Sequence, residues 1–475
     1  MKFLKLLCLF ICSLLIGTSF LNEKSASYTK TYALTENVET NIYEKIDAYL
    51  DESVTKAHFP AMSITIVDKT QTLFSRTYGN CKDTNVPFLL GSVSKSFTAL
   101  GVMQLVEQEK IDLHSKISKY LPNSTDGERI TILQLLNHTS GLGEHQNLKD
   151  YKIINSQNSH HYANVNYSLL GKIIEKVSGL KYEEYISKNI FKPLEMTKSA
   201  ATYEEAKNNG LIDSYQNWFG INVNTNPNFP KNDKAWITVP AGYLSSSTTD
   251  LGKYLQMYLN GGKDIISSES INKMFFENVQ VEASIPYKYG MGWTLIDETL
   301  KQPILRHSGL VETGMSVIYL LPESELGIAI AINSNDYFVG KDMMDRIDWG
   351  VALMLMGYEP NIIGDNEYTL RHLLYDFIYV FLLIIAILPL CLINIYNKKI
   401  RKGKSWIKII LLILLHLLLP ILILLLPQVF FGIPFWVVGN FVPDLFTCLI
   451  VSSCLLFVGG ISKSILLIFN TRHKI

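Results

Sequence analysis

Three uncharged apolar runs near the C-terminus constrain this chain more than any other feature. They cover residues 377–393, 409–426 and 445–462, and a helix needs about 20 apolar residues to cross a bilayer. The sequence therefore predicts three transmembrane helices, at 374–396, 407–427 and 444–468 within a membrane segment at 373–470. The lipid bilayer is a predicted partner.

The charges around these runs predict an orientation. The loop between the first two runs is strongly basic and has no acidic residue, and it contains Lys398, Lys399, Arg401, Lys402, Lys404 and Lys408. Basic loops stay in the cytoplasm, which places the chain before residue 374 outside the cell. Independently, Lys2 and Lys5 precede an uncharged run at 6–21, a pattern typical of a signal peptide or uncleaved anchor at 1–22. We expect a multi-pass cell-membrane protein with an extracytoplasmic domain at 36–360.

The composition excludes other classes of protein. Lys and Arg total 43, Asp and Glu also total 43, and the net charge is zero, whereas nucleic-acid binders usually carry a basic excess. The chain is 48% hydrophobic and 11% aromatic, enough to bury a large core. No nucleic-acid partner is expected.

The pattern within residues 36–360 favours an α+β fold with an antiparallel sheet and a helical subdomain. Strand-like runs lie near both ends of the domain, and helical patterns lie between them. The expected strands are 61–67, 72–78, 304–307, 316–321 and 327–333, and the helices include 97–106, 167–177 and 248–258. This arrangement predicts a sheet that uses both ends of the domain.

One serine stands at a predicted strand-to-helix junction. Ser92 and Lys95 form an S-x-x-K motif, and residues three apart share a helix face. A serine needs a base to become a nucleophile, and Lys95 can supply one. The same pattern recurs elsewhere, but only Ser92 follows a glycine and opens a long helix, which we expect to be amphipathic.

Two further motifs complete a candidate site. Tyr162 and Asn164 form a Y-x-N motif: a phenolate stabilised by a nearby ammonium could be the base, and an amide side chain suits a substrate amide. His307 begins the string His-Ser-Gly, in which Gly309 allows close backbone approach. The N–H of Leu310 could form an oxyanion hole with that of Ser92.

The three motifs in this order resemble the class C β-lactamase and penicillin-binding-protein-like serine hydrolases over roughly residues 40–355. Supporting strings are L-L-N-H-T-S-G at 135–141, P-A-G-Y at 240–243 and Y-G-M-G-W at 289–293. The C-terminal spans resemble membrane-tethered members from Gram-positive bacteria. The resemblance implies a β-lactamase/transpeptidase-like domain with its site in a cleft between sheet and helices.

The resemblance also implies roles for residues. Ser92 would be acylated, Lys95 and Tyr162 would handle its proton, with the resting base left open, and Asn164 would contact a substrate amide. True β-lactamases carry lysine where this chain has His307. A permanent cation for the carboxylate of a β-lactam is therefore missing, and little or no β-lactamase activity is expected, although acylation by a β-lactam stays open.

The predicted function is hydrolysis of D-alanyl amides or esters of the cell envelope through a Ser92 acyl-enzyme. Two alternatives stay open: a general carboxylesterase or D-aminopeptidase, and a non-catalytic envelope-binding sensor that signals through the spans. No cofactor or metal is implied, because the chain has no H-E-x-x-H string and His160 and His161 lack ligand spacing.

Overall fold

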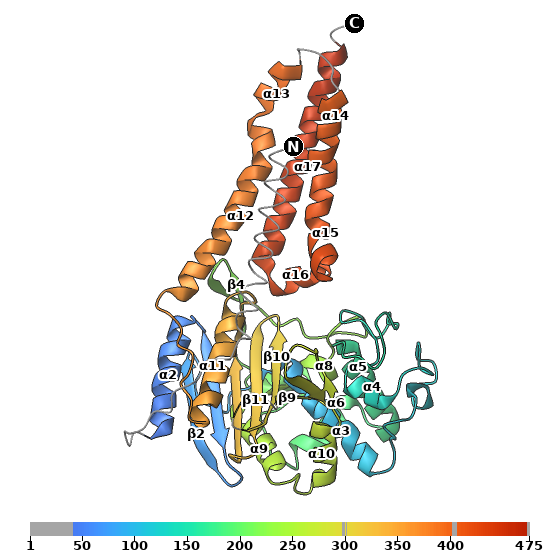
Figure 1. Ribbon diagram of the computed structural model, residues 1–475, viewed down its shortest axis with the longest axis vertical. Coiled ribbons are helices and arrows are strands. Elements are labelled where there is room, and N and C mark those ends of the chain that lie inside the picture. The colour runs from blue at the N-terminus through green and yellow to red at the C-terminus, as the bar shows by residue number, and fades with distance from the viewer. Residues whose placement is uncertain (1–40, 297–299, 301, 401–405, 473–475) are drawn as a thin grey trace.

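The computed structural model describes residues 41–296, 300, 302–400 and 406–472. The predicted signal or anchor segment at 1–22 lies outside the described residues. The described chain forms a globular domain and a long bundle of helices that rises from it (Figure 1).

An eight-stranded antiparallel sheet forms the centre of the domain. Its spatial order is β2-β1-β12-β11-β10-β9-β8-β7. The strands are β1 Ala61–Val67, β2 Thr72–Gly79, β7 Val279–Gln280, β8 Tyr287–Gly290, β9 Trp293–Ile296, β10 Ile304–Val311, β11 Gly314–Leu321 and β12 Leu326–Ile332. Strand β1 pairs with β12, with Ile64 opposite Ile330, so the sheet does use both ends of the domain, as predicted.

Short strands link the sheet to the rest of the domain. β3 Phe88–Leu89 pairs with β6 Ser245–Ser246, and β13 Ser334–Asn335, β4 Tyr215–Trp218 and β5 Ile221–Asn224 form a three-stranded sheet.

Helices cover both faces of the central sheet, which explains why β1 and β11 are buried along their whole length. The edge strand β2 is buried only at Phe74 and Tyr78. One face packs against α2 Ile42–Lys56 and α11 Gly340–Leu355. The other face packs against a helical region made of α3 Ser94–Glu107, α4 Ile132–Leu136, α5 Asn164–Ser178, α6 Tyr182–Ile186, α7 Tyr203–Asn208, α8 Val239–Gly242, α9 Thr248–Leu259 and α10 Ser268–Phe276.

Helix α3 differs from its prediction in one respect. Every residue from Ser94 to Leu105 is buried, so the helix is not amphipathic. The apolar stripe at 97–106 was correctly assigned to a helix, but the opposite face carries small and weakly polar residues such as Ser96 and Thr98, whose hydroxyls bond to Val93 and Pro240 carbonyls. A fully buried helix requires such partners for its polar groups.

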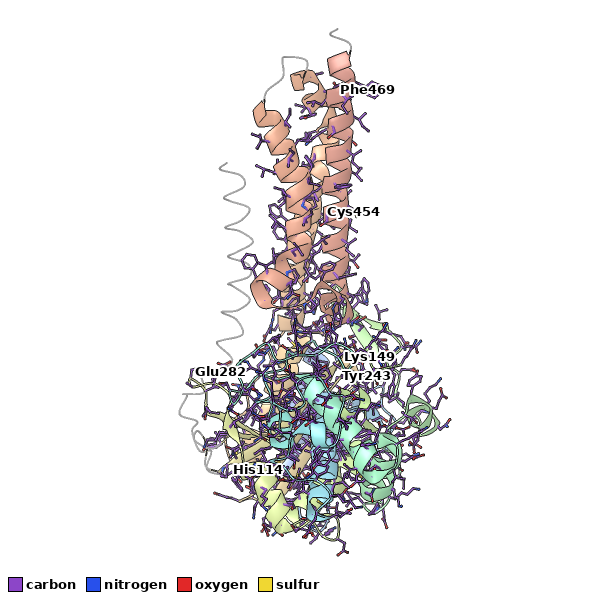
Figure 2. All side chains as sticks on the ribbon, turned by 90° about the vertical axis from the view of Figure 1, so that its right-hand side faces the viewer. His114, Lys149, Tyr243, Glu282, Cys454 and Phe469 are labelled. Carbon is purple, nitrogen blue, oxygen red and sulfur yellow. The ribbon has the colours of Figure 1, made fainter. Side chains whose placement is uncertain are left out.

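Three C-terminal helices are long and apolar enough to cross a membrane: Glu367–Cys391, Ile409–Phe431 and Pro443–Phe469. The bundle comprises α12 Glu367–Cys391, α13 Ile393–Ile400, α14 Trp406–Ile413, α15 Leu419–Phe431, α16 Phe435–Phe441 and α17 Pro443–Arg472, with a π-helical turn at Leu414–Leu418. Large apolar side chains project outward along its length (Figure 2), among them Phe377, Leu422 and Phe469, each more than half exposed. Such a surface suits lipid rather than water.

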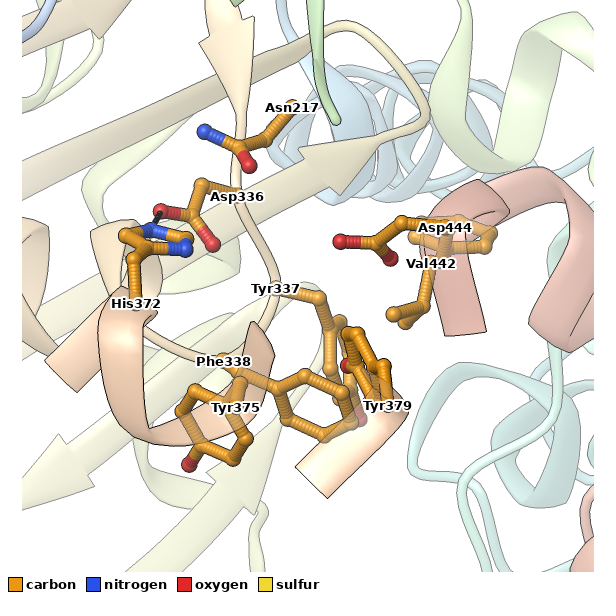
Figure 3. Close-up of a pocket in the computed structure, with 10 residues that line it drawn as sticks. Asn217, Asp336, Tyr337, Phe338, His372, Tyr375, Tyr379, Val442 and Asp444 are labelled. Carbon is orange, nitrogen blue, oxygen red and sulfur yellow. Dashed lines mark hydrogen bonds and ion pairs between the residues drawn. The ribbon is translucent and has the colours of Figure 1, made fainter. Parts of the chain in front are cut away.

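The bundle docks on the domain through α16. The ring of Trp436 lies 5.5 Å from that of Trp236, and Phe441 lies 6.0 Å from the same ring. The Asp444 carboxylate accepts the N–H of Phe219 at 3.2 Å. Beside this contact, Asp336 and His372 pair at 2.8 Å in the wall of a cavity of about 10 Å³, room for about one water (Figure 3). Spans and domain therefore share a polar and aromatic junction.

A buried ion pair ties β10 to α11. The Arg306 guanidinium donates to Asp348 at 2.7 Å and to Tyr319 at 2.8 Å, and the Tyr319 hydroxyl donates to Asp348 at 2.8 Å. Asp348 is 1% exposed. Because side chains alternate along a strand, this anchor on the α11 face leaves the neighbouring His307 on the opposite face.

We expect Asp348→Ala to destabilise the domain by about 3–5 kcal/mol, because the variant leaves the charge of Arg306 buried without this partner. The measurement is thermal unfolding of the detergent-solubilised protein, followed by tryptophan fluorescence. Asp345→Ala is the matched control: Asp345 lies 3.2 Å from Arg306 but is 38% exposed, so its loss should cost less than about 1 kcal/mol. Equal effects of the two variants would contradict the assignment.

Candidate active site

Ser92 lies on a tight turn that the backbone of β10 approaches closely. The turn is a short 3-10 helix, Gly91–Val93, that leads into α3. Gly91 has φ +51°, and a Cβ there would lie 2.3 Å from the Leu310 nitrogen. Gly309 is equally restricted, since a Cβ would lie 1.9 Å from the Leu90 carbonyl oxygen and 2.8 Å from the Ser92 nitrogen. The two glycines let β10 and the serine turn touch.

This contact brings together the backbone N–H groups of Ser92 and Leu310. An oxyanion hole needs two such donors converging on one point near the nucleophile. The glycine contacts show that the two nitrogens lie on facing segments, and their use as an oxyanion hole stays a prediction.

The Lys95 amine lies at the centre of the site. Its Nζ is 3.0 Å from Ser92 Oγ, 2.7 Å from Asn164 Oδ1 and 2.6 Å from the Ala241 carbonyl oxygen. The side chain is completely buried, and these partners come from the turn before α3, from α5 and from α8.

Burial controls the charge of this amine. It lowers the pKa of Lys95 well below the usual 10.5, and the Glu144 carboxylate offsets part of that shift. A neutral amine has two N–H bonds and one lone pair. Asn164 Oδ1 and the Ala241 carbonyl can accept both hydrogens, which leaves the lone pair for the Ser92 hydroxyl.

Tyr162 contacts the nucleophile from the other side. Its hydroxyl donates to Ser92 Oγ at 2.7 Å, and the Lys95 Nζ lies 4.8 Å from the centre of its ring. Burial raises the pKa of Tyr162 above its ordinary value, despite the bond to Ser92. The phenolate considered from the sequence required a nearby ammonium, whereas burial disfavours the ammonium form of Lys95. The geometry therefore favours Lys95 as resting base and Tyr162 as a proton donor.

His138 holds the Tyr162–Asn164 segment in place. Its Nδ1 accepts the N–H of Ala163 at 3.2 Å and lies 3.0 Å from the Asn166 side-chain nitrogen. Because Nδ1 accepts, the ring proton belongs on Nε2. Burial, with Lys95, His160 and His307 nearby, lowers the pKa of His138 well below its ordinary value. His138 lies in a turn, but it is fully buried and supports the site.

His307 is a neutral member of the cleft wall. Its Nδ1 lies 2.6 Å from the carbonyl oxygen of Gly292, so Nδ1 carries the proton. Gly292 packs on the first turn of α3, where a Cβ would lie 2.8 Å from the Ser96 Cα. Burial, with Lys95 and Arg306 nearby, lowers the pKa of His307 to about 3, and the bond to Gly292 opposes that shift. The cleft has no permanent cation at this position.

The structure thus brings the predicted site residues to one place. Ser92, Lys95, Tyr162 and Asn164 are joined by hydrogen bonds, and His307, Gly309 and Leu310 face them from β10. Their catalytic roles remain predictions. Neither the Ala241 carbonyl nor the support from His138 is predicted from the sequence, although both residues lie in strings that carry the family resemblance.

The chain has an antiparallel sheet flanked by helices, with a serine, a lysine and a tyrosine in contact between them. This arrangement is that of the β-lactamase fold. The chain matches the Beta-lactamase family over residues 46–351 and belongs to that family. The resemblance and the fold class predicted from the sequence are confirmed.

Several relatives are known. Protein flp of Staphylococcus aureus (strain MRSA252) is 28% identical over 332 residues, covering 63% of this chain and 64% of the relative. Teichoic acid D-alanine hydrolase of the same strain is 29% identical over 275 residues, covering 52% and 65%. The chain therefore spans just under two thirds of the length of these relatives.

Solved structures agree on the fold. The octameric penicillin-binding protein homologue from Pyrococcus abyssi superimposes with a TM-score of 0.59 at 28% identity, covering 67% of this chain and 78% of that one. A D-stereospecific amidohydrolase from Streptomyces sp. gives a TM-score of 0.51 at 21% identity, covering 64% and 97%. The second comparison shows the fold alone.

We expect kcat/KM for an uncharged ester, p-nitrophenyl acetate, to fall as the pH drops through the pKa of Lys95, because the protonated amine cannot accept a proton. Since burial lowers that pKa, activity should already be high near neutral pH. His307→Asn should keep the same midpoint, because His307 is neutral above about pH 5. A midpoint that moves by more than about one pH unit in this variant would assign the titration to His307.

Proposed function

We propose that the chain is a membrane-tethered, extracytoplasmic serine hydrolase that cleaves D-alanyl esters or amides of the cell envelope. The observation that carries the proposal is the convergence of the buried Lys95 amine and the Tyr162 hydroxyl on Ser92 Oγ, at 3.0 and 2.7 Å. The substrate class is supported by the relative named as a teichoic acid D-alanine hydrolase.

In the proposed acylation, Ser92 Oγ attacks the substrate carbonyl and its proton moves to the Lys95 lone pair. The carbonyl oxygen becomes negative and accepts the N–H groups of Ser92 and Leu310, a stabilisation of about 3–4 kcal/mol per donor in comparable sites. Collapse of this intermediate breaks the bond to the leaving group, which takes a proton from Tyr162. The proton held by Lys95 then restores the phenol.

Deacylation reverses the roles of these groups. A water molecule attacks the acyl carbon and gives its proton to Lys95, and the same two N–H groups hold the oxyanion. The bond to Oγ breaks, Ser92 recovers a proton, and D-alanine leaves as the free amino acid. Asn164 keeps the amine oriented in both halves, since its Oδ1 accepts from Lys95 at 2.7 Å.

The same geometry argues against efficient β-lactam hydrolysis. A β-lactam carries a carboxylate that needs a cation, yet His307 is neutral and the Arg306 guanidinium is paired with Asp348 on the opposite face. Acylation of Ser92 by a β-lactam would therefore be slow.

The bundle supports the proposed orientation. The helices α13 and α14 and the C-terminal end of α17 lie at the end of the bundle remote from the domain (Figure 1). The basic segment at 398–408 connects α13 and α14 in the sequence, and the positive-inside rule assigns such a segment to the cytoplasm. The domain then lies outside the cell, close to the membrane surface where α16 contacts it.

A panel of substrates tests the activity. We expect hydrolysis of D-alanyl esters or amides, little turnover of nitrocefin, and a loss of at least about 10⁴-fold in kcat for Ser92→Ala. Ser178→Ala is a matched control, because Ser178 and Lys181 share the S-x-x-K spacing outside the cleft. Turnover of p-nitrophenyl acetate without any D-alanyl substrate would indicate a general carboxylesterase, and folded protein without any turnover or probe labelling would indicate a sensor.

Labelling of single cysteines tests the orientation. In a background without the six native cysteines, we expect Lys181→Cys to react with a membrane-impermeant maleimide on intact cells. Lys402→Cys should react only after permeabilisation, because the basic loop is retained in the cytoplasm. The reverse pattern would place the catalytic domain inside.

A further inference from the structure

The hairpin formed by β4 and β5 is wedged between the domain and the candidate spans. Gln216 on β4 donates a hydrogen bond to the Asn440 carbonyl of α16. Asn217 donates at 2.7 Å to the hydroxyl of Tyr368 on α12, and that hydroxyl donates at 3.2 Å to the Gly220 carbonyl. The hairpin lies at the base of the bundle (Figure 1). These contacts fix its position relative to the spans.

The tip of the hairpin lies where the apolar runs of two spans begin. The N–H of Phe219 donates at 3.2 Å to Asp444, one residue before the run at 445–462. The Phe219 ring lies 6.1 Å from that of Tyr379, which belongs to the run at 377–393. Because apolar runs of this length match the hydrocarbon thickness of a bilayer, their ends mark its boundary. The tip therefore stands at the level of the membrane surface.

Phe219 is an unusual residue for this turn. Phe219 and Gly220 form the two-residue loop between the strands, with φ +52° and +76°. Turns with two positive φ angles normally select Asn, Asp or Gly, and a bulky side chain in this region is strained. The turn nevertheless holds an aromatic ring that is 40% exposed. A turn that faced only water would not require such a residue.

Apolar side chains continue from the tip along β5. Ile221 is 66% exposed and Val223 is 41% exposed, and both lie on one face because side chains alternate along a strand. Strand β5 is an edge of the three-stranded sheet and carries no charged residue. An apolar edge strand is prone to association unless charge or cover blocks it. This edge therefore calls for a cover.

The neighbouring helix α12 presents the same kind of surface. Three leucines of its first turns are each more than half exposed: Leu370, Leu373 and Leu374. Their spacing marks one helix face, which continues into the span at Phe377. The opposite face, at His372, packs on the turn of the hairpin. The apolar surface of the bundle thus extends without interruption to the level of β5.

We propose that the β4–β5 hairpin and the first turns of α12 form a lipid-contacting surface, with the side chains of Phe219, Ile221 and Val223 inserted among the headgroups of the leaflet next to the domain. The proposal rests on the proposed membrane tethering and adds a contact that does not span the bilayer. The free backbone edge of β5 limits its depth, because unpaired N–H and C=O groups do not enter the hydrocarbon. The contact is interfacial and sets the orientation of the domain on the membrane.

Quenching of fluorescence by lipid tests this surface. An environment-sensitive fluorophore is attached to Ile221→Cys in the full-length protein without its native cysteines, in vesicles of phosphatidylcholine and phosphatidylglycerol. Spin-labelled phosphatidylcholine carries its nitroxide either on the headgroup or near the end of an acyl chain. We expect the headgroup nitroxide to lower the fluorescence about twofold or more, and the acyl-chain nitroxide to lower it less, because interfacial contacts reach only about 5–10 Å into the boundary.

Two control positions accompany this measurement. Gln71→Cys lies in the exposed turn between β1 and β2, at the end of the domain remote from the bundle (Figure 1), and neither lipid should quench its label. Leu422→Cys lies on the second candidate span and is exposed, so the acyl-chain nitroxide should quench its label more than the headgroup nitroxide does.

The controls separate two kinds of failure. An unquenched label at Ile221→Cys beside a quenched label at Leu422→Cys would overturn the lipid contact while the tethering stands. A blue-shifted but unquenched label at Ile221→Cys would overturn it too, and would indicate that a protein segment or a second copy of the chain covers the hairpin. If the label at Leu422→Cys is not quenched either, the membrane tethering fails and the hairpin contact fails with it.

Discussion

The burial of one lysine is the condition on which the site depends. Lys95 is completely enclosed, and Asn164 and Ala241 accept hydrogen bonds from its amine. Burial disfavours the charged form of this amine and so lowers its pKa. The buried helix α3 and the packing around it therefore set the properties of the Lys95 amine. They exclude water, lower the pKa of the amine and direct it at Ser92.

Close backbone contact is the second requirement, and it comes from glycine rather than from side chains. Gly91 and Gly309 have no room for a Cβ, so the serine turn and β10 meet at backbone distance. The Arg306–Asp348 pair holds the same strand on its far face. One strand thus carries a structural anchor on one side and the cleft wall on the other, because its side chains alternate.

The helical bundle also packs on the domain. Helix α16 places Trp436 and Phe441 on Trp236, which in turn stacks on His145. The segment between the second and third candidate spans therefore contacts the helical region of the domain.

The sequence by itself determined the three candidate membrane spans, the α+β class with both ends of the domain in one sheet, and the choice of Ser92, Lys95, Tyr162, Asn164 and His307 as candidate site residues. These follow from local patterns: apolar length, strand and helix periodicity, and motif spacing. Only the tertiary structure decided that α3 is buried on all sides, that Ala241 and His138 support the site, and that burial disfavours the charged forms of Lys95 and His307. Burial and partners depend on segments far apart in the chain, and a charge state depends on burial, so no local pattern can specify them.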